Sequence, residues 1–224
     1  MSIALLKSAF PDSHEIVPLT VEQYHGMLAA GILVEGEPIE LLDGLLVRKS
    51  RGEGMTIHPQ HALVVNKLNM LLVAPVGAMG CHVRVQNPVT LPPLDEPEPD
   101  LALVKGLPAD FADRHPGPAD ITCVIEVAGT SLERDRTIKQ RIYAAAGIPQ
   151  YVIANLIHSC VEVFEKPDSA KGRYRWRAEL TGDKEVSLLV TEGRRLMVAV
   201  ADCLPSRGRD VSGGHGDRPT GRSL

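Results

Sequence analysis

The sequence lacks the features that mark membrane, secreted and redox-active proteins. No stretch of its 224 residues reaches the roughly 18 consecutive apolar residues of a membrane-spanning helix. Residues 1–10 contain neither the long apolar segment nor the cleavage site of a signal peptide. We therefore expect a cytoplasmic protein that does not act in a membrane. The cysteines form no CxxC pair, which argues against a zinc knuckle or a redox pair; they are Cys81, Cys123, Cys160 and Cys203.

An excess of positive charge is also missing. The formal net charge is −4, whereas a protein that coats nucleic acid non-specifically is basic. This balance disfavours broad electrostatic binding of DNA but is compatible with an enzyme that carries a local basic patch. The motifs GxSxG, GxxxxGK[ST] and HExxH are absent as well, so the common hydrolase, phosphate-loop and zinc-protease patterns find no support.

The composition that remains is that of a globular protein with flanking segments. Apolar residues make up 44% of the chain and charged residues 23%, which is enough for a hydrophobic core. Residues 1–17 read as an N-terminal arm and residues 18–204 as a single domain. Residues 205–224 are rich in Gly, Arg, Asp and Ser, and burial there cannot offset the entropy of ordering. We predict a disordered C-terminal tail.

Local patterns predict a mixed sheet with few helices. A capping box at residues 20–23 opens a helix that ends near residue 30, Pro59 suits the first turn of a second helix, and another capping box at residues 130–133 opens a third that Gly147 closes. The passage 121–154 reads as strand, helix and parallel strand. The strands are expected at 39–42 and 45–48 around an Asp-Gly turn, and at 81–85, 88–91, 100–104, 121–127, 151–154, 161–165, 174–180 and 186–190.

The most informative feature is a pair of carboxylates on two of these strands. Glu126 lies inside the apolar run 121–127, where a carboxylate loses hydration and needs a metal ion, a proton or a cation. Asp100 follows Pro99 at the start of a neighbouring short strand and could supply the other half of a site. Oxygen ligands of this kind suit magnesium or manganese. The alternative is that each carboxylate is a strand-end cap or an ion-pair partner.

A lysine on the helix after Glu126 could complete this site. Asp135, Lys139 and Tyr143 recur at four-residue spacing, and Lys139 borders the stripe that faces the core. From there its ammonium could point back toward Glu126. In phosphodiester hydrolysis such a lysine can orient or help deprotonate the attacking water and stabilise charge on the phosphate. The alternative is an exposed helix lysine that pairs with Asp135.

Taken in order, these segments resemble a known family. The set consists of Glu40–Gly44, His61, Pro99–Asp100, Glu126–Leu132, Asp135 to Lys139, and Tyr143–Pro149. In this order and spacing the chain resembles, over roughly residues 19–180, the Uma-type family of "putative restriction endonucleases" in the PD-(D/E)xK nuclease superfamily. The resemblance implies an α/β (α+β) fold with a restriction-endonuclease-like core. Such a core is a central mixed β-sheet flanked by helices, to which this chain adds C-terminal strands.

The resemblance also implies an activity and a site. It implies a divalent-metal-dependent endonuclease that hydrolyses phosphodiester bonds in DNA, with Mg²⁺ or Mn²⁺ as the cofactor. Asp100 and Glu126 are the implied metal ligands, joined by the backbone carbonyl of Val127, and Lys139 is the third catalytic residue. In the superfamily's usual motif the lysine stands two residues after the acid, where this chain has Ala128. The Uma-type pattern places it on the following helix, which matches Lys139.

Three more residues match family positions near this site. Glu40 could add an acidic group to the metal site, or it is a strand-end carboxylate beside the Asp-Gly turn. His61, at a helix start, is either structural or a phosphate contact. Gln86, at a strand end, is expected to line the cleft. Residues 133–141 carry four basic and two acidic side chains, so this helix could contact DNA, although solvated arginines are the alternative.

Two other interpretations stay open. The first is a non-catalytic nucleic-acid-binding or regulatory protein on the same nuclease-like fold. The acidic balance and the displaced lysine favour it, whereas the retention of all three site residues disfavours it. The second concerns assembly: a homodimer whose interface is formed by strands within residues 174–190 would place two sites together, and nucleases of this superfamily use two sites to cut two strands.

Overall fold

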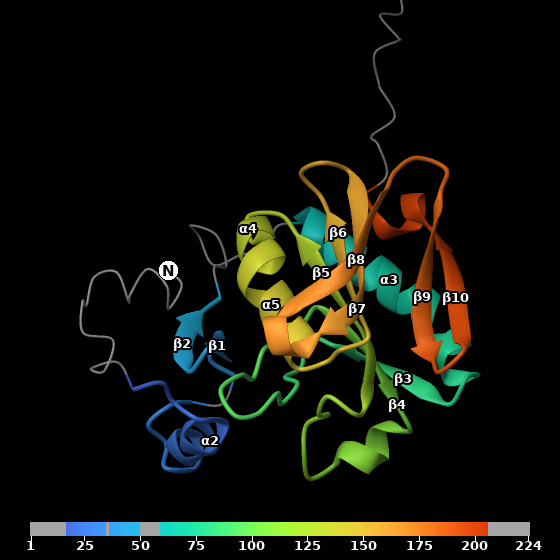
Figure 1. Ribbon diagram of the computed structural model, residues 1–224. Helices are drawn as coiled ribbons and strands as arrows, with labels where there is room; N and C mark the ends of the chain where they lie inside the picture. Colours follow the sequence, from blue (N-terminus) through green and yellow to red (C-terminus); the bar gives the residue numbers. More distant parts are fainter. Residues whose placement is uncertain (1–16, 35, 50–58, 206–224) are drawn as a thin grey trace, which may run out of the picture.

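A six-stranded mixed sheet forms the centre of the molecule (Figure 1). The computed structural model describes residues 17–34, 36–49 and 59–205. All neighbouring strands of the sheet are antiparallel except β5 and β6, which run parallel and confirm the predicted crossover. In spatial order the strands are β3 (Cys81–Val85), β4 (Leu101–Lys105), β5 (Ile121–Ala128), β6 (Gln150–Asn155), β7 (Cys160–Asp168) and β8 (Arg173–Leu180).

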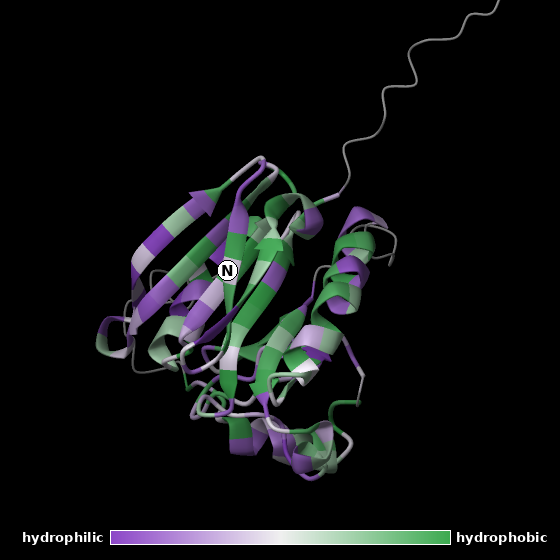
Figure 2. Cartoon of the chain, turned by 90° about the vertical axis from the view of Figure 1, so that its right-hand side faces the viewer, coloured by the Kyte–Doolittle hydropathy of each residue, from purple (hydrophilic) through white to green (hydrophobic). Residues whose placement is uncertain are grey.

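Both faces of the sheet are covered, as the predicted fold class requires. Helix α3 (Pro59–Gly77) and the hairpin of β9 (Glu185–Thr191) and β10 (Arg194–Ala199) pack on one face. The opposite face carries α4 (Leu132–Arg134), a π-helical turn (Asp135–Lys139) and α5 (Gln140–Ala145). Figure 2 shows that hydrophobic residues concentrate on the central strands, between these layers.

Strand β5 shows how the sheet positions a carboxylate. All its residues are buried, because both faces of the strand are covered. Ile125 and Val127 belong to the core under α3, whereas Val124 and Ala128 belong to the core under α5. Successive side chains of a strand alternate between faces, so Glu126 shares the α5 face with Val124 and Ala128.

The N-terminal elements confirm their sequence signals. Helix α2 (Val21–Ala29) begins with the predicted capping box of Thr20 and Gln23. Strands β1 (Ile39–Leu42) and β2 (Leu45–Arg48) form the predicted hairpin, whose turn residues Asp43 and Gly44 both have positive φ. A Cβ at Gly44 would collide with the chain at Pro18, which explains why the turn requires glycine there.

Residues 88–91 are wrongly predicted as a strand. Gln86 has a φ of 49° and ends β3, and Pro88 has no N–H to donate. The N–H groups of Val89 and Thr90 donate to the carbonyls of Pro97 and Pro116 instead of to a strand. The apolar run is therefore an extended loop segment held by other loops.

The helix after β5 also differs from its prediction. The expected capping box at residues 130–133 is absent: Ser131 occupies the N-cap position without a side-chain cap. The Ser131 hydroxyl instead donates to Asp135 Oδ2 at 2.6 Å. The helix continues through the π turn, which the sequence periodicity did not indicate, and ends where predicted, at Gly147 with a φ of 77°. Strand β10 was not predicted either, since its first residues are polar and exposed.

Several expectations concern the ends and the general class of the chain. The predicted arm (residues 1–17) and tail (residues 205–224) lie outside the described residues except for positions 17 and 205. Within the described part, no helix is long and apolar enough to cross a membrane. The four cysteines are free and buried.

Candidate active site

Four carboxylates surround one ammonium group on the α5 side of the sheet. We call Glu40, Asp100, Glu126, Asp135 and Lys139 the carboxylate cluster. The side chains come from β1, from the residue before β4, from β5 and from the π turn. Four of the five residues are at most 4% exposed, and Asp100 is half-buried.

Lys139 connects two of the carboxylates. Its Nζ lies 2.9 Å from Glu40 Oε1 and 2.9 Å from Glu126 Oε1. The Tyr143 hydroxyl donates to the same Glu126 oxygen at 3.0 Å. The alternative of an exposed lysine paired with Asp135 is therefore wrong, because Lys139 is buried and forms its ion pairs with the two glutamates. A π turn carries an extra residue, and such turns are frequent at functional sites.

Asp100 brings three predicted residues together. Its Oδ2 accepts the Val127 backbone N–H at 2.9 Å and lies 3.0 Å from His61 Nε2. Its Oδ1 accepts the Gln86 side-chain amide at 3.2 Å. Its own N–H lies 3.4 Å from Glu126 Oε2. His61 and Gln86 thus contact the carboxylate cluster through Asp100.

The hairpin of β1 and β2 fixes Glu40 in the cluster. Glu40 Oε1 accepts the backbone N–H of Glu98 at 2.8 Å, and Glu98 itself pairs with Lys49 at 2.5 Å. Glu40 is 1% exposed, so it is more than a strand-end carboxylate beside a turn. Its second oxygen, Oε2, is buried without a hydrogen-bond partner.

The carboxyl groups of the cluster differ in their pKa values. Burial, together with the charges of Asp135, Asp100 and Glu40, raises the pKa of Glu126 to about 8 against the opposing charge of Lys139. Burial likewise raises the pKa of Asp135. Burial acts in the same sense on Asp100, but the hydrogen bond and charge of His61 and the Val127 N–H bring its pKa below the ordinary value.

Lys139 holds its proton at neutral pH. Burial alone would lower its pKa, but the charges of Glu126, Glu40 and Asp135 raise it above the ordinary value of a lysine. The same ammonium lowers the pKa of Glu40, overcoming the effect of burial on that carboxyl. The raised pKa favours the ammonium form, which can stabilise negative charge and orient a water molecule.

The donor set of the cluster fits a hard divalent cation. Glu40 Oε2 and Asp135 Oδ1 are buried oxygens without a hydrogen-bond partner, and the carboxylates outnumber the single ammonium. Among the described residues, no group of three or more His, Cys, Asp and Glu side chains is arranged as a complete metal site. Magnesium does not require one, since one or two carboxylates with water and substrate phosphate commonly hold it.

Comparison with known proteins agrees with this geometry. Residues 21–199 match the Uma2 family model, described as "Putative restriction endonuclease". The chain belongs to this family. The matched segment contains every residue of the carboxylate cluster, and the match confirms the resemblance seen in the sequence. None of the curated proteins compared matches the chain.

A solved structure shares the fold of this Uma2 family member. It is described as a "putative nuclease belonging to DUF820" from Anabaena variabilis. The two chains are 14% identical and superpose with a TM-score of 0.63, covering 83% of this chain and 97% of the other. At this identity the likeness establishes the architecture, and the chemistry rests on the residues of this chain.

The sequence did not identify two members of the site. It also left two roles possible for the arginines of this helix, a contact with DNA or a solvated position. Asp135 and Tyr143 recur with Lys139 at four-residue spacing, and that spacing is the signal that could have found them. Two of the arginines on this helix are engaged within the protein: Arg136 pairs with Glu162 and Arg141 with Asp43.

Proposed function

We propose that the protein is a divalent-metal-dependent endonuclease that hydrolyses phosphodiester bonds in DNA. The observation that carries this proposal is the excess of buried carboxylates over cations in the carboxylate cluster. Such an arrangement is costly unless a bound proton or a further cation compensates it. Membership of a family described as restriction endonucleases supports phosphodiester hydrolysis as the reaction.

The proposed roles follow from the contacts within the cluster. Asp100 and Glu126 would hold Mg²⁺ or Mn²⁺, with the backbone carbonyl of Val127 as a further ligand and Glu40 acting through water. When bound, the ion supplies positive charge that polarises the phosphate and acidifies a water molecule. Lys139 keeps its ammonium beside Glu126, where it stabilises charge on the phosphate. His61 and Gln86 hold Asp100 in place from the open side of the site.

Cleavage of a DNA duplex tests this proposal. We expect Mg²⁺- or Mn²⁺-dependent cleavage by the wild-type chain and a loss on the order of a hundredfold or more in Asp100→Asn. The matched control is Glu192→Gln in the exposed turn between β9 and β10, outside residues 174–190, which should cleave like the wild type. Undiminished metal-dependent cleavage by Asp100→Asn would show that the site is assigned wrongly.

A second candidate function is a non-catalytic nucleic-acid-binding or regulatory protein on the same fold. The bonds of Lys139 to both Glu40 and Glu126 favour it, because they compensate part of the carboxylate charge without a metal ion. Under this alternative, no divalent metal supports cleavage, and Glu126→Gln binds its partner as the wild type does. The cleavage assay therefore separates the two candidates directly.

The homodimer is also a proposal. Strand β8 is an edge strand of the six-stranded sheet, so it offers one side of its backbone to a second copy. An interface through residues 174–190 would place two sites on one DNA duplex. Light scattering that shows only monomer at micromolar concentration would contradict this arrangement.

A further inference from the structure

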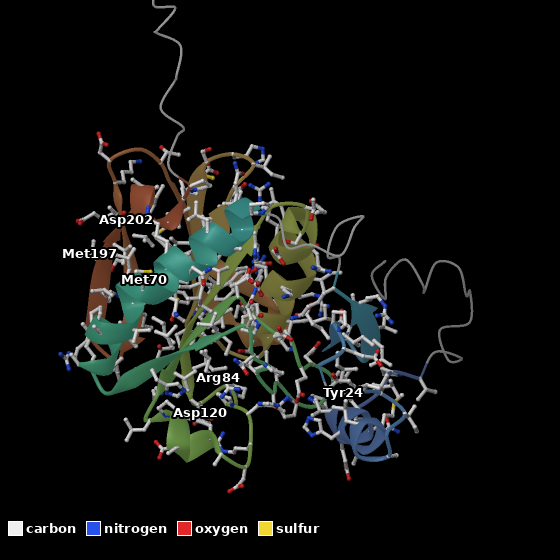
Figure 3. The ribbon with its side chains drawn as sticks, turned by 180° about the vertical axis from the view of Figure 1, so that it is seen from behind. Tyr24, Met70, Arg84, Asp120, Met197 and Asp202 are labelled. Carbon is white, nitrogen blue, oxygen red and sulfur yellow. The ribbon has the colours of Figure 1, made fainter. Side chains whose placement is uncertain are left out.

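A hollow of about 810 Å³ lies beside the carboxylate cluster and shares no residue with it. Its walls come from α2, β3, the 90–96 loop and the 111–118 loop. Figure 3 labels Arg84 on β3, with Tyr24 of α2 and Asp120 near the second loop on neighbouring elements. The side chains that matter here are His25, Arg84, Thr90, Glu96, Asp113 and Arg114.

Arg84 is the one arginine of this hollow that forms no ion pair with a carboxylate in the described part of the chain. No carboxylate lies within ion-pair distance of it among the described residues, and its nearest polar partner is His115 Nδ1, 3.2 Å from Nη2. Its Nε is buried without a hydrogen-bond partner. Burial lowers the pKa of the guanidinium, with no carboxylate to oppose the shift. A half-buried cation in this state is unfavourable unless an anion compensates it.

The other charges around the hollow do not supply that anion. Glu96 accepts hydrogen bonds from Thr90 and pairs with His25, both at 2.8 Å. Arg114 pairs with Asp120 outside the hollow, at 2.6 Å. The remaining lining carboxylate, Asp113, is exposed at the rim. The hollow therefore has room for a ligand beside a guanidinium that no carboxylate of the lining pairs with.

The hollow and the carboxylate cluster share one face of the sheet. Arg84 pairs with Ala102 across β3 and β4, and Ala102 belongs to the core under α5. Gln86, two residues further along the chain, contacts Asp100 of the cluster. Arg84 therefore lies near the end of β3 that adjoins Asp100, since the next residue, Val85, is paired with Leu101.

We propose that Arg84 binds a backbone phosphate of the nucleic-acid strand whose cleavage site lies at the carboxylate cluster. A guanidinium has planar donors that match phosphate geometry, which suits this role better than a point charge. The contact fixes the register of the strand relative to Asp100 and Glu126 without reading its sequence. This inference rests on the proposed nuclease function, because it takes the anion from the same substrate.

The test measures binding rather than cleavage, so that the two proposals can fail separately. Affinity for a labelled DNA duplex is followed by fluorescence anisotropy over a range of salt concentrations, in the Glu126→Gln background. We expect Arg84→Gln to weaken binding. The slope of the logarithm of the binding constant against the logarithm of the salt concentration should become shallower by about 0.9, which corresponds to the loss of one phosphate contact. The control Arg194→Gln, at an exposed position of β10 outside residues 174–190, should leave both unchanged.

Each outcome is informative. An unchanged slope in Arg84→Gln, or no binding by the parent protein, overturns the inference whatever the cleavage assay shows. If Arg84→Gln makes the slope shallower but the wild-type chain shows no cleavage, the phosphate contact is supported and only the nuclease proposal is contradicted. Thermal unfolding with inorganic phosphate forms a separate arm. Arg84-dependent stabilisation by phosphate with an unchanged DNA slope would assign the hollow to a free anion and overturn the strand contact.

A second pair of variants covers the case in which Arg84→Gln does not fold. Ala112 lines the hollow and is exposed, whereas Ala109, on the preceding 3₁₀ helix Pro108–Phe111, is exposed and does not line it. Ala112→Glu adds a negative charge at the proposed phosphate site, and Ala109→Glu adds the same charge beside it. The first should weaken DNA binding more than the second, and equal effects would overturn the inference.

Discussion

Two buried glutamates lie in one row across the sheet and have opposite surroundings. Glu126 on β5 is paired in register with Ile153 on β6, and Ile153 is paired with Glu162 on β7. Glu162 is fully buried and accepts hydrogen bonds from Arg136, Arg177 and the Asn155 amide. Its carboxylate is therefore surrounded by donors.

Glu126 has the reverse environment. It shares Lys139 with Glu40, and it faces the charges of Asp100 and Asp135. Burial raises the pKa of both glutamates, but the arginines bring the pKa of Glu162 below its ordinary value, whereas the pKa of Glu126 rises to about 8. The difference teaches that the neighbours of a buried carboxylate, and not its burial alone, distinguish a structural ion pair from a candidate functional site. The Glu162 network is a completed structural ion pair, and the carboxylate cluster is short of positive charge.

Removal of the Lys139 ammonium should cause the largest loss in the free energy of unfolding. Lys139→Met leaves buried carboxylates without their ammonium, and loss of one partner of a buried ion pair costs about 3–5 kcal/mol. We expect this loss in the free energy of unfolding measured by urea denaturation. Lys184→Met, in an exposed turn, is the control. A loss no larger than that of the control would mean that the cluster does not depend on its ammonium.

Glu126→Gln should separate function from stability. Cleavage should fall by a factor on the order of 10² to 10⁴, because a site carboxylate is lost. The free energy of unfolding should stay unchanged or rise, since one of several repelling carboxylates is neutralised. Initial cleavage rates and urea denaturation of the same preparation measure both effects. A marked loss of stability together with normal cleavage would reverse the assignment.

The same substitution at Glu162 should give the opposite pattern. Glu162→Gln weakens charge-assisted hydrogen bonds to Arg136 and Arg177, and we expect a loss of roughly 1.5–3 kcal/mol in the free energy of unfolding. Cleavage should stay within about twofold of the wild type at a temperature where the variant is folded. A large loss of cleavage in folded protein would show that the two glutamates belong to one site.

Glu126 and Glu162 should make the free energy of unfolding depend on pH in opposite directions. Glu126 has a folded pKa of about 8 against an ordinary value of 4.5, so the folded state binds the extra proton and stability falls as pH rises between these values. Glu162 has a lowered pKa, so its contribution is present above 4.5 and is lost as pH falls through the folded value. Relative to the wild type, Glu126→Gln should gain stability from pH 5 to pH 8. A constant difference would contradict the environment assigned to Glu126.

The sequence could predict the parts of the site that rest on local signals. Asp100 follows a proline, Glu126 interrupts an apolar strand, and the Asp-Gly turn defines the hairpin that carries Glu40. The fold class followed from the same patterns and from the family resemblance, which the Uma2 match confirms.

The parts that failed depend on contacts between distant segments or on a change of helical phase. The π turn was not predicted, because the four-residue spacing of Asp135, Lys139 and Tyr143 is that of a regular helix. Residues 88–91 look like a strand locally, but their hydrogen bonds go to loops elsewhere in the chain. The Arg84 hollow is formed by four separate segments and leaves no local pattern.

The central claim is that the carboxylate cluster, and not the Glu162 network, takes a divalent cation. Thermal unfolding of the wild type, Glu126→Gln and Glu162→Gln with and without Mn²⁺ tests it most directly. Binding to the folded state stabilises by about 2.7 kcal/mol at a hundredfold excess over the dissociation constant. We predict a metal-dependent rise in Tm for the wild type and Glu162→Gln and none for Glu126→Gln. An equal rise in all three proteins, or a rise that disappears only in Glu162→Gln, would contradict the claim.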